Sequence, residues 1–288
     1  MGAISSMVTN LAVLGSPIAH SKSPALHRAA YRVLGLDWHY DAFEVAPAGL
    51  EDFIRSCGNQ WRGLSLTMPL KQDVMPLLDF ADPVAVLSGG ANTVLFREDG
   101  GGLTLHGFNT DVFGIVEAFR HAGVARLSTV RILGAGATAA SALIAVAQLG
   151  AARVLVSARS EIKLVALVEL GRQLEVDVHA ARLDSDNSVN SDIVPDAVIS
   201  TLPGGADHPY RFDASTRACS VLFDVAYDPW PSPLAASWLE SGGRVIPGIE
   251  MLVNQALMQV RIFVEGSADR ILPREAAVLA AMRESVGI

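Results

Sequence analysis

The chain has 288 residues, which indicates two domains at roughly 100–200 residues per domain. Half of the residues are hydrophobic and 18% are charged, a composition that supports sizeable cores and argues against a disordered chain. The net charge of −8 argues against nucleic acid or an anionic membrane as the main partner, because both attract a basic face.

The two cysteines, Cys57 and Cys219, are too few for a disulfide framework, although a single disulfide between them stays an open alternative. Neither lies in a CxxC motif or a His/Cys cluster, so we expect reduced thiols and no metal site. The first ten residues lack Lys, Arg and the layout of a secretory signal peptide, and no apolar run reaches the length of a membrane helix. These features predict a cytoplasmic location and leave monomer and homodimer both open.

The first part of the chain predicts a mixture of strands and helices. Apolar runs that end at Gly or Pro indicate buried strands, and amphipathic stretches closed by Gly indicate helices. The predicted elements are a strand at 11–14, a helix at 24–34, a strand at 39–45, a helix at 47–57, a strand at 64–67, and a hairpin formed by 92–96 and 104–107 around a glycine-rich turn.

From Asp111 onward the pattern alternates more regularly between helix and strand. The predicted helices are 111–121, 138–149, 161–169, 233–240, 251–265 and 273–284, and the predicted strands are 129–133, 153–157, 177–179, 197–200, 221–225 and 244–246. Such alternation predicts parallel sheets with helices on both faces. We therefore expect an α/β fold of two domains. An N-terminal α/β domain covers residues 1–110 and is completed by C-terminal helices in 247–288, and a Rossmann-like, doubly wound domain covers 111–246. The interface between such domains is a favoured place for a ligand.

A glycine-rich loop follows the strand 130–133 and precedes a helix, which is the context that confirms a dinucleotide-binding motif. Gly134 permits the tight turn, Gly136 lets a pyrophosphate approach the backbone, and Ala139 is small enough for close packing of helix on sheet. The amides at the start of the helix bind phosphate oxygens. The alternative is a glycine turn that serves packing only.

The end of the next strand selects the cofactor. An NAD site places Asp or Glu there for the ribose 2′-hydroxyl, whereas this chain has Ser157, Ala158, Arg159 and Ser160 before the first acid, Glu161. A guanidinium can bind a 2′-phosphate through two parallel hydrogen bonds. The sequence therefore predicts NADP, with a solvated Arg159 as the alternative.

Several polar residues lie at strand ends without an obvious packing purpose. Ser21 and Ser23 could donate to a carboxylate at the start of a helix, although such serines alone are more often caps. Lys71 comes just after the strand 64–67 and Asp111 begins a helix, so a solvated lysine and a helix-terminal acid are the alternatives.

Taken together, these segments resemble the shikimate dehydrogenase family over nearly the whole chain, from Gly15 to Gln255 and in the family's order. The segments are GSPIAHSKSPALH, TMPLK, GGANT, GFNTD, GAGATAA, ARS, DVAYDPWPSPL and GIEMLVNQA. The resemblance implies an NADP(H)-dependent oxidoreductase that interconverts 3-dehydroshikimate and shikimate in the biosynthesis of chorismate and the aromatic amino acids. Without it, the residues predict only an NADP-dependent oxidoreductase of two domains.

The resemblance also implies a role for individual positions. Ser21 and Ser23 hold the substrate carboxylate, and Lys71 and Asp111 form the proton-transfer pair. The other residues expected at the substrate are Thr67, Asn92, Tyr227 and Gln255, together with Asp111. The residues expected at the cofactor are Gly134, Ala135, Gly136, Ala137, Thr138, Ala158, Arg159, Ser160 and Lys163, with Val225 and Gly248 near the nicotinamide.

The chemistry of ketone reduction supports a lysine in this position. Hydride delivery to the carbon leaves negative charge on the oxygen, and the protein must manage the proton. An ammonium beside the carbonyl stabilises that charge and donates the proton, so we expect this role for Lys71. Asp111 would orient Lys71 and bind a hydroxyl.

The sequence departs from the family at several positions. Arg28 and Ser65 stand where the family usually has Asn, Ala137 replaces a frequent glycine, Ala158 replaces the Asn of an Asn-Arg-Thr motif, and residues 200–203 replace an Asn-x-Thr-Pro-like loop. The shorter hydroxyl of Ser65 loses a substrate contact or relays it through water. These changes bear on substrate preference and NADP affinity more than on reaction type.

Two other functions compete with this interpretation. A quinate/shikimate dehydrogenase with NAD preference has the same fold, but Arg159 without a neighbouring acid argues against NAD and Ser23 suits shikimate. A non-catalytic NADP-binding regulator would need a disabled Lys71 or Asp111, and both residues are present.

Overall fold

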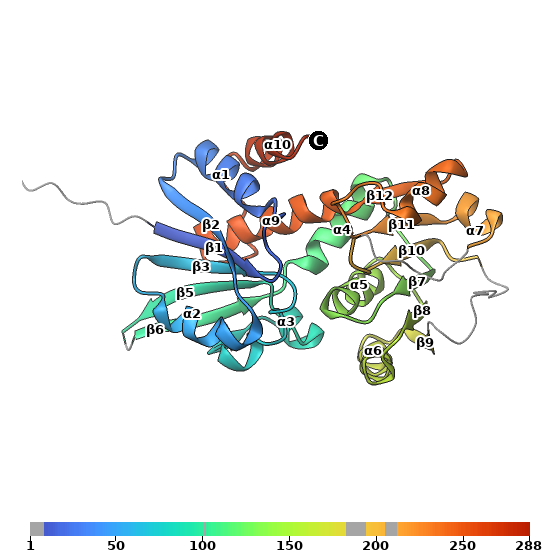
Figure 1. Ribbon diagram of the computed structural model, residues 1–288, viewed down its shortest axis with the longest axis horizontal. Helices are drawn as coiled ribbons and strands as arrows, with labels where there is room; N and C mark the ends of the chain where they lie inside the picture. The colour runs from blue at the N-terminus through green and yellow to red at the C-terminus, as the bar shows by residue number, and fades with distance from the viewer. Residues whose placement is uncertain (1–8, 101, 183–193, 205–211) are drawn as a thin grey trace, which may run out of the picture. The chain divides into compact units, whose positions relative to one another are not determined.

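The computed structural model describes residues 9–100, 102–182, 194–204 and 212–288 (Figure 1). The chain divides into two compact units, the first made of residues 1–110 and 253–288 and the second of residues 111–252. The second break falls inside helix α9 (Gly248–Glu265), so this helix contributes to both units. Within the described ranges, no helix is long and apolar enough to cross a membrane.

The first unit contains a mixed sheet with the strand order β2-β1-β3-β5-β6-β4. β1 pairs in parallel with β2 and β3, whereas β5 pairs antiparallel with β3 and β6. The predicted hairpin is confirmed as β5–β6. The hairpin makes this sheet mixed, because a hairpin connection makes neighbouring strands antiparallel. The strands are β1 (Thr9–Gly15), β2 (Trp38–Glu44), β3 (Trp61–Leu66), β4 (Phe80–Ala81), β5 (Thr93–Asp99) and β6 (Gly102–Phe108).

Helices cover both faces of this first sheet (Figure 1). α2 (Leu50–Ser56) and α3 (Pro83–Ser88) lie on one side, and α1 (Ser23–Leu34), α9 and α10 (Glu275–Ser285) lie on the other. Ala12 and Leu14 of β1 belong to the apolar cluster under α2. Because successive strand residues point to opposite faces, Leu11 and Val13 face the layer of α1 and α9.

Helix α9 is tied to the sheet and to the last helix by two arginines. Arg62 donates from Nε to the carbonyl of Phe263 at 2.6 Å, near the end of α9. Arg261 binds both carboxylate oxygens of Glu275 in α10, at 2.6 and 2.5 Å, in the bidentate geometry that guanidinium groups favour. A Cβ on Gly63 would lie 2.6 Å from the Phe263 ring, so this glycine permits the close approach of α9 to β3.

The second unit contains a wholly parallel sheet with the strand order β12-β11-β10-β7-β8-β9. Counted from β7, this is the 3-2-1-4-5-6 order of a doubly wound fold, which confirms the predicted fold class. The strands are β7 (Thr129–Leu133), β8 (Arg153–Ala158), β9 (Asp177–Arg182), β10 (Ala197–Ser200), β11 (Val221–Asp224) and β12 (Val245–Pro247), and the helices before α9 are α4 (Asp111–His121), α5 (Ala137–Gln148), α6 (Glu161–Gln173), α7 (Ala214–Cys219) and α8 (Pro233–Glu240).

The structure extends or adds a few elements relative to the predictions. α6 runs on to Gln173, β9 runs on to Arg182, and α9 begins at Gly248 instead of Met251. The short elements η1 (Pro47–Gly49), η2 (Met75–Leu77), β4, α3 and α7 were not predicted as such. α3 and α7 have six residues each, too few for a helical period to show in the sequence, and each begins at an Asp that caps it, Asp82 and Asp213.

One buried histidine in the first unit is neutral and incompletely bonded. His27 of α1 donates from Nδ1 to the carbonyl of Ser23 at 2.9 Å and stacks on Tyr40 with ring centroids 4.0 Å apart. Its Nε2 has no hydrogen-bond partner among the described residues. Burial lowers the pKa of His27 from 6.5 to about 4.

This pKa predicts that the first unit loses stability in mild acid. Above pH 6.5 both states are neutral at His27, whereas between pH 6.5 and about 4 the unfolded chain binds a proton that the folded chain does not. The free energy of unfolding should therefore fall by up to about 3 kcal/mol over this window. Urea unfolding at several pH values measures it. His27→Phe keeps a buried ring and should flatten the dependence by that amount, and an unchanged slope in this variant would contradict the assignment.

Candidate functional site

In the first unit, the loops after β1 and β3 meet at the carboxyl ends of these parallel strands. The amide of Thr67 donates to the carbonyl of Leu14 at 2.9 Å, and the amide of Ser16 donates to the carbonyl of Met68 at 3.0 Å. A Cβ on Gly15 would lie 2.3 Å from the Thr67 methyl group. Glycine at position 15 therefore lets the two loops pack against each other.

The backbone of Lys71 is fixed to the segment that carries Asn92. The amide of Ala91 donates to the carbonyl of Lys71 at 2.8 Å, and the carbonyl of Asn92 accepts from Leu66 at 2.8 Å. The amide of Asn92 donates to the carbonyl of Phe108 at 3.0 Å. Lys71 is half-buried, and Asn92 is buried. Three loops that are separate in sequence are thus joined by backbone hydrogen bonds.

The side chain of Asn92 brings two of the predicted substrate residues together. Its Nδ2 donates to Thr110 Oγ1 at 2.9 Å and to Gln255 Oε1 at 3.2 Å. Its Oδ1 accepts from the Thr110 amide at 2.9 Å and from Thr93 Oγ1 at 2.9 Å. Gln255 is buried as well, on α9. The structure therefore places Asn92 and Gln255 in one buried polar cluster.

The two predicted carboxylate-binding serines lie where α1 begins. The N-cap position of α1 is Lys22, and its side chain makes no capping hydrogen bond. Ser21 Oγ accepts only a long bond from the Ser23 amide, at 3.4 Å, and the buried Ser23 hydroxyl hydrogen-bonds the phenol of Tyr40. Neither serine hydroxyl is therefore needed to cap the helix, which leaves room for a ligand as the reason for their presence.

In the second unit, the glycine loop lies between β7 and β10, where the strand order reverses. Gly134 has a φ of 105°, and a Cβ there would lie 2.4 Å from Thr201 Oγ1. Gly136 is the N-cap of α5, and a Cβ there would meet nothing within 4 Å. Ala139 is buried against the sheet. The open backbone at a helix start, beside a switch point, fits the pyrophosphate of a dinucleotide.

The other predicted residues here are Ala135, in the loop, and Ala137 and Thr138, in the first turn of α5. Ala135 and Ala137 are half-buried, as is Thr138.

The end of β8 fits a phosphate better than a ribose hydroxyl. Ala158 ends the strand, and Arg159 and Ser160 follow as exposed residues. Ser160 is the N-cap of α6, yet its side chain makes no capping hydrogen bond. Lys163 is exposed one turn later, and the first acid is Glu161 inside the helix. The charges at this position favour an anion, because cations precede and follow the single carboxylate.

The two residues predicted near the nicotinamide contact each other. A Cβ on Gly248 would lie 2.1 Å from the carbonyl oxygen of Val225, so glycine is required for this approach. The amide of Val225 donates to the carbonyl of Ser200 at 3.0 Å, which holds the end of β11 beside β10.

The loop that carries Tyr227 is held by a buried carboxylate. Asp224 accepts from the Ala226 amide at 3.2 Å and from the hydroxyl of Ser232, which in turn caps α8. Tyr227 is half-buried, and burial raises the pKa of its phenol, with a further increase from the negative charge of Asp228. The phenol is therefore protonated at neutral pH and can act as a hydrogen-bond donor.

Asp111 is the first residue of α4 and is buried. A carboxylate in the first turn of a helix interacts favourably with the helix dipole. It directly follows Thr110, whose amide is bound to the Asn92 side chain.

Neither cysteine is in a disulfide. Cys57 is buried, which raises the pKa of its thiol to about 12, and Cys219 is exposed. Over the residues that the structure describes, no group of three or more His, Cys, Asp or Glu side chains is placed to hold a metal ion.

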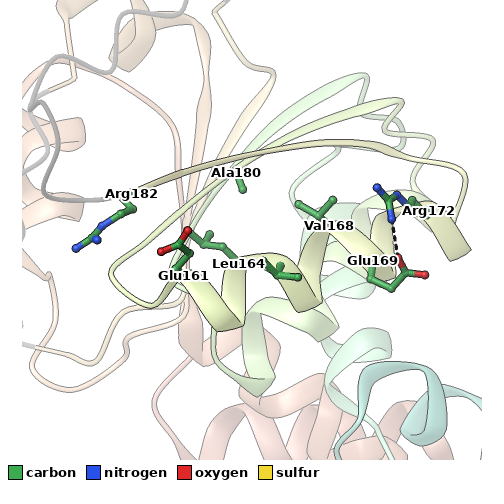
Figure 2. Close-up of a pocket in the computed structure, with 8 residues that line it drawn as sticks. Glu161, Leu164, Val168, Glu169, Arg172, Ala180 and Arg182 are labelled. Atoms are coloured by element: carbon green, nitrogen blue, oxygen red, sulfur yellow. Dashed lines mark hydrogen bonds and ion pairs between the residues drawn. The ribbon is translucent and has the colours of Figure 1, made fainter.

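A cavity of about 430 Å³ lies along α6, on its side toward β9 (Figure 2). Leu164 and Val168 form its apolar floor, and Ala180 and Arg182 of β9 line the opposite side. The Glu169–Arg172 ion pair, at 3.0 Å, borders one end. Of the predicted cofactor residues none lines this cavity, so it is separate from the glycine loop.

Sequence reasoning missed several residues that hold the site together. Thr93, Tyr40 and Gln259 form hydrogen bonds within the Asn92 cluster or next to it, and Thr201 packs on Gly134. Gln259 lies four positions after Gln255, so the helical period was a signal for it. Tyr40 had no such signal, because an aromatic residue in an alternating strand is typical of core.

Comparisons with known proteins agree with this arrangement. A family model described as the shikimate dehydrogenase substrate binding domain matches residues 13–94. The shikimate dehydrogenase (NADP(+)) of Oleidesulfovibrio alaskensis is 34% identical over 256 residues, which are 87% of this chain and 88% of that protein. The pentafunctional AROM polypeptide of Malassezia globosa is 35% identical over 282 residues, which are 94% of this chain but only 17% of that polypeptide.

Solved structures show the same fold. The crystal structure of Mycobacterium tuberculosis shikimate dehydrogenase has a TM-score of 0.80 and 34% identity, and the match covers 96% of this chain and 99% of that one. The Thermus thermophilus shikimate 5-dehydrogenase in complex with NADP(H) and shikimate has a TM-score of 0.74 and 27% identity, with 96% and 100% covered. Identity above 30% over most of the bacterial relative, together with the order of motifs and the fold, shows that this chain belongs to the shikimate dehydrogenase family.

Proposed function

We propose that this chain is an NADP(H)-dependent shikimate dehydrogenase, which interconverts 3-dehydroshikimate and shikimate in aromatic biosynthesis. The first unit would bind the substrate and the second unit NADP(H). One observation supports the proposal most directly: a chain of this family has both the buried Asn92–Gln255 cluster and a glycine loop followed by Arg159. The proposal includes a cytoplasmic location, with which the two free cysteines agree.

The substrate roles follow from the polarity of each group. Ser21 offers a hydroxyl donor at the start of α1, where the helix dipole also favours a carboxylate. Ser23 would offer a second donor in exchange for its bond to Tyr40. The Asn92 amide gives its two hydrogens to Thr110 and Gln255, and a ring hydroxyl would bind it in exchange for one of these bonds. Thr67 and Tyr227 add further hydroxyl groups from the loops after β3 and β11.

The cofactor roles follow from the second unit. Gly134 to Thr138 would hold the pyrophosphate, and Arg159, Ser160 and Lys163 would hold the 2′-phosphate. Val225 and Gly248 would shape the nicotinamide pocket through their close backbone contact. When bound, NADPH supplies the hydride that reduces a ketone.

Lys71 would manage the proton. Reduction of the ketone leaves negative charge on its oxygen, and an ammonium there stabilises the charge and donates a proton to that oxygen. In alcohol oxidation the amine takes the proton back. The hydrogen bond between the Ala91 amide and the Lys71 carbonyl fixes the backbone from which this long side chain extends. Less conformational entropy is therefore lost when the ammonium is positioned at the substrate. Asp111 would orient the ammonium and bind a hydroxyl.

An assay of four substrate pairs tests the function directly. We expect NADP⁺ reduction, followed at 340 nm, to be fastest with shikimate, and slower by at least about tenfold when NAD⁺ replaces NADP⁺. Quinate adds a hydroxyl and loses ring planarity, so we expect a lower kcat/KM with either cofactor. Preference for quinate with NAD⁺ would establish the paralogous activity instead. No turnover with any pair would favour a binding protein.

Replacing Lys71 tests the proton-transfer role. Lys71→Ala should lower kcat by about 10²–10⁴-fold, the range that general acid–base catalysis contributes. The Kd for NADP⁺, measured by calorimetry, should stay within about twofold. Arg55→Ala removes an exposed cation of the same unit and should leave both quantities unchanged. Turnover of Lys71→Ala close to that of the unaltered enzyme would refute the role.

Replacing Arg159 tests the choice of cofactor. Arg159→Ala should raise the KM for NADP⁺ by about 10- to 100-fold, because one charge-assisted contact to the 2′-phosphate is lost. The KM for NAD⁺, which lacks that phosphate, should change by less than about threefold. Arg172→Ala, on the helix that follows Arg159 and paired with Glu169, is the matched control for loss of charge. Equal effects on both cofactors would argue against a phosphate contact.

A further inference from the structure

A chain of buried hydroxyl and amide groups runs through the first unit beside Asn92. Tyr40 of β2 donates to Ser65 Oγ at 2.7 Å, and Ser65 donates to Gln259 Oε1 at 3.0 Å. Gln259 Nε2 donates to Thr93 Oγ1 at 3.0 Å and to the Asn92 carbonyl at 3.1 Å. Thr93 donates to Asn92 Oδ1 at 2.9 Å. All five side chains are buried.

These hydrogen bonds all run in one direction. Each hydroxyl has a single hydrogen, so a hydroxyl that donates to the next group must accept from the one before. The direction ends at Asn92 Oδ1, which accepts from Thr93 and from the Thr110 amide. Asn92 must then turn its Nδ2 toward Gln255 Oε1. The two Nδ2 hydrogens go to Thr110 Oγ1 and Gln255 Oε1, so the chain fixes which end of the Asn92 amide faces Gln255.

The other end of the chain reaches a second predicted substrate residue. The Tyr40 phenol gives its one hydrogen to Ser65, so the Ser23 hydroxyl donates to the phenol oxygen. One set of bonds thus connects the position expected to bind a carboxylate with the position expected to bind a ring hydroxyl. Ser65 is the middle of this path, and Gln259 is its link to Asn92.

Packing alone does not call for these polar groups. A buried hydroxyl or amide contributes little net stability when it is bonded and costs more when it is not, and matched apolar groups often serve equally well. Gln259 has three bonds in this cluster, to Ser65, Thr93 and the Asn92 carbonyl, and all are to residues of strands β3 and β5 or of the turn before β5. Such a network specifies one arrangement of its members.

We propose that Gln259 is a positioning residue that acts through Ser65 and Thr93 to hold Asn92 in the orientation that binds shikimate. Its amide continues the hydrogen bonds from the Ser65 hydroxyl to Thr93 and the Asn92 carbonyl. The inference rests on the proposed function and deepens it, because it adds a residue that sets substrate affinity without touching the substrate.

Three variants test the role. Gln259→Leu removes all three bonds at similar volume and should raise the Kd for shikimate by about tenfold or more. Gln259→Glu keeps the length but can donate at most one hydrogen bond in place of two, so its increase should be smaller. Tyr40→Phe removes the first donor of the chain and should raise the Kd by about two- to fivefold. Shikimate binding is measured by calorimetry without cofactor, and the KM for shikimate and for NADP⁺ by assay.

Two further variants separate positioning from general stability. Ser220→Ala deletes a buried hydroxyl that donates to the Pro195 carbonyl in the second unit, and it should lower Tm without changing the Kd for shikimate. Ser65→Asn combined with Gln259→Ala moves the amide from α9 to β3. This double variant should bind shikimate at least about threefold more tightly than Gln259→Ala alone.

The outcomes are distinct. A higher Kd and KM for shikimate with an unchanged KM for NADP⁺ supports the positioning role. If Gln259→Leu lowers Tm but leaves the Kd for shikimate within about twofold of the unaltered protein, the positioning role is overturned. If Gln259→Leu does not fold, the same result for Tyr40→Phe overturns it. An unaltered protein that neither binds nor oxidises shikimate would instead overturn the proposed function.

Discussion

The buried amide of Asn92 is the group on which the polar site of the first unit depends. A buried amide without partners is costly, so all of its hydrogen-bonding atoms must be satisfied from nearby. Here the partners come from β5, from the residue before α4 and from α9, and one of them lies 163 positions away in sequence. Satisfying one side chain therefore forces three distant segments to converge. A site made in this way is rigid before a ligand arrives, because moving any segment would break bonds that water does not reach.

The second unit depends on a backbone constraint of a different kind. Gly134 has a left-handed conformation and lies so close to Thr201 that no side chain fits. This tight turn connects the end of β7 directly to the start of α5. The backbone amides at the start of α5 therefore lie near the point between β7 and β10 where the strand order reverses. In the proposed function, the first unit would recognise its ligand with side chains, and the second with backbone amides and the cations that follow β8. Gly134 tolerates little change, because its φ of 105° and its close approach to Thr201 exclude a side chain.

Much of the fold could be predicted from the sequence because Gly and Pro mark the ends of its elements. The helix at 111–121 and the strand at 129–133 have the predicted bounds, and the alternation after Asp111 gave the doubly wound sheet. The roles proposed for Gly134 and Arg159 could be inferred from the sequence, because each depends on only a few neighbouring residues. The network beside Asn92 could not be predicted, since Ser65 and Gln259 meet across 194 positions and no local pattern records such a pair. The two-residue strand β4 and the cavity beside α6 likewise arise only from tertiary packing.

Two departures from the family pattern converge on one residue, Tyr40. Arg28 donates from Nε to the carbonyl of Tyr40 at 3.0 Å and pairs with Asp41 at 2.7 Å, which joins α1 to β2. Ser65 accepts from the hydroxyl of the same tyrosine. The Arg28–Asp41 pair is exposed and contributes little energy by itself, but the bond to the carbonyl fixes the strand from which the tyrosine extends. Neither departure, therefore, is an isolated loss of an amide. Arg28 holds the backbone of Tyr40, Ser65 holds its hydroxyl, and Gln259 on α9 completes a network in which these substitutions are compatible with each other.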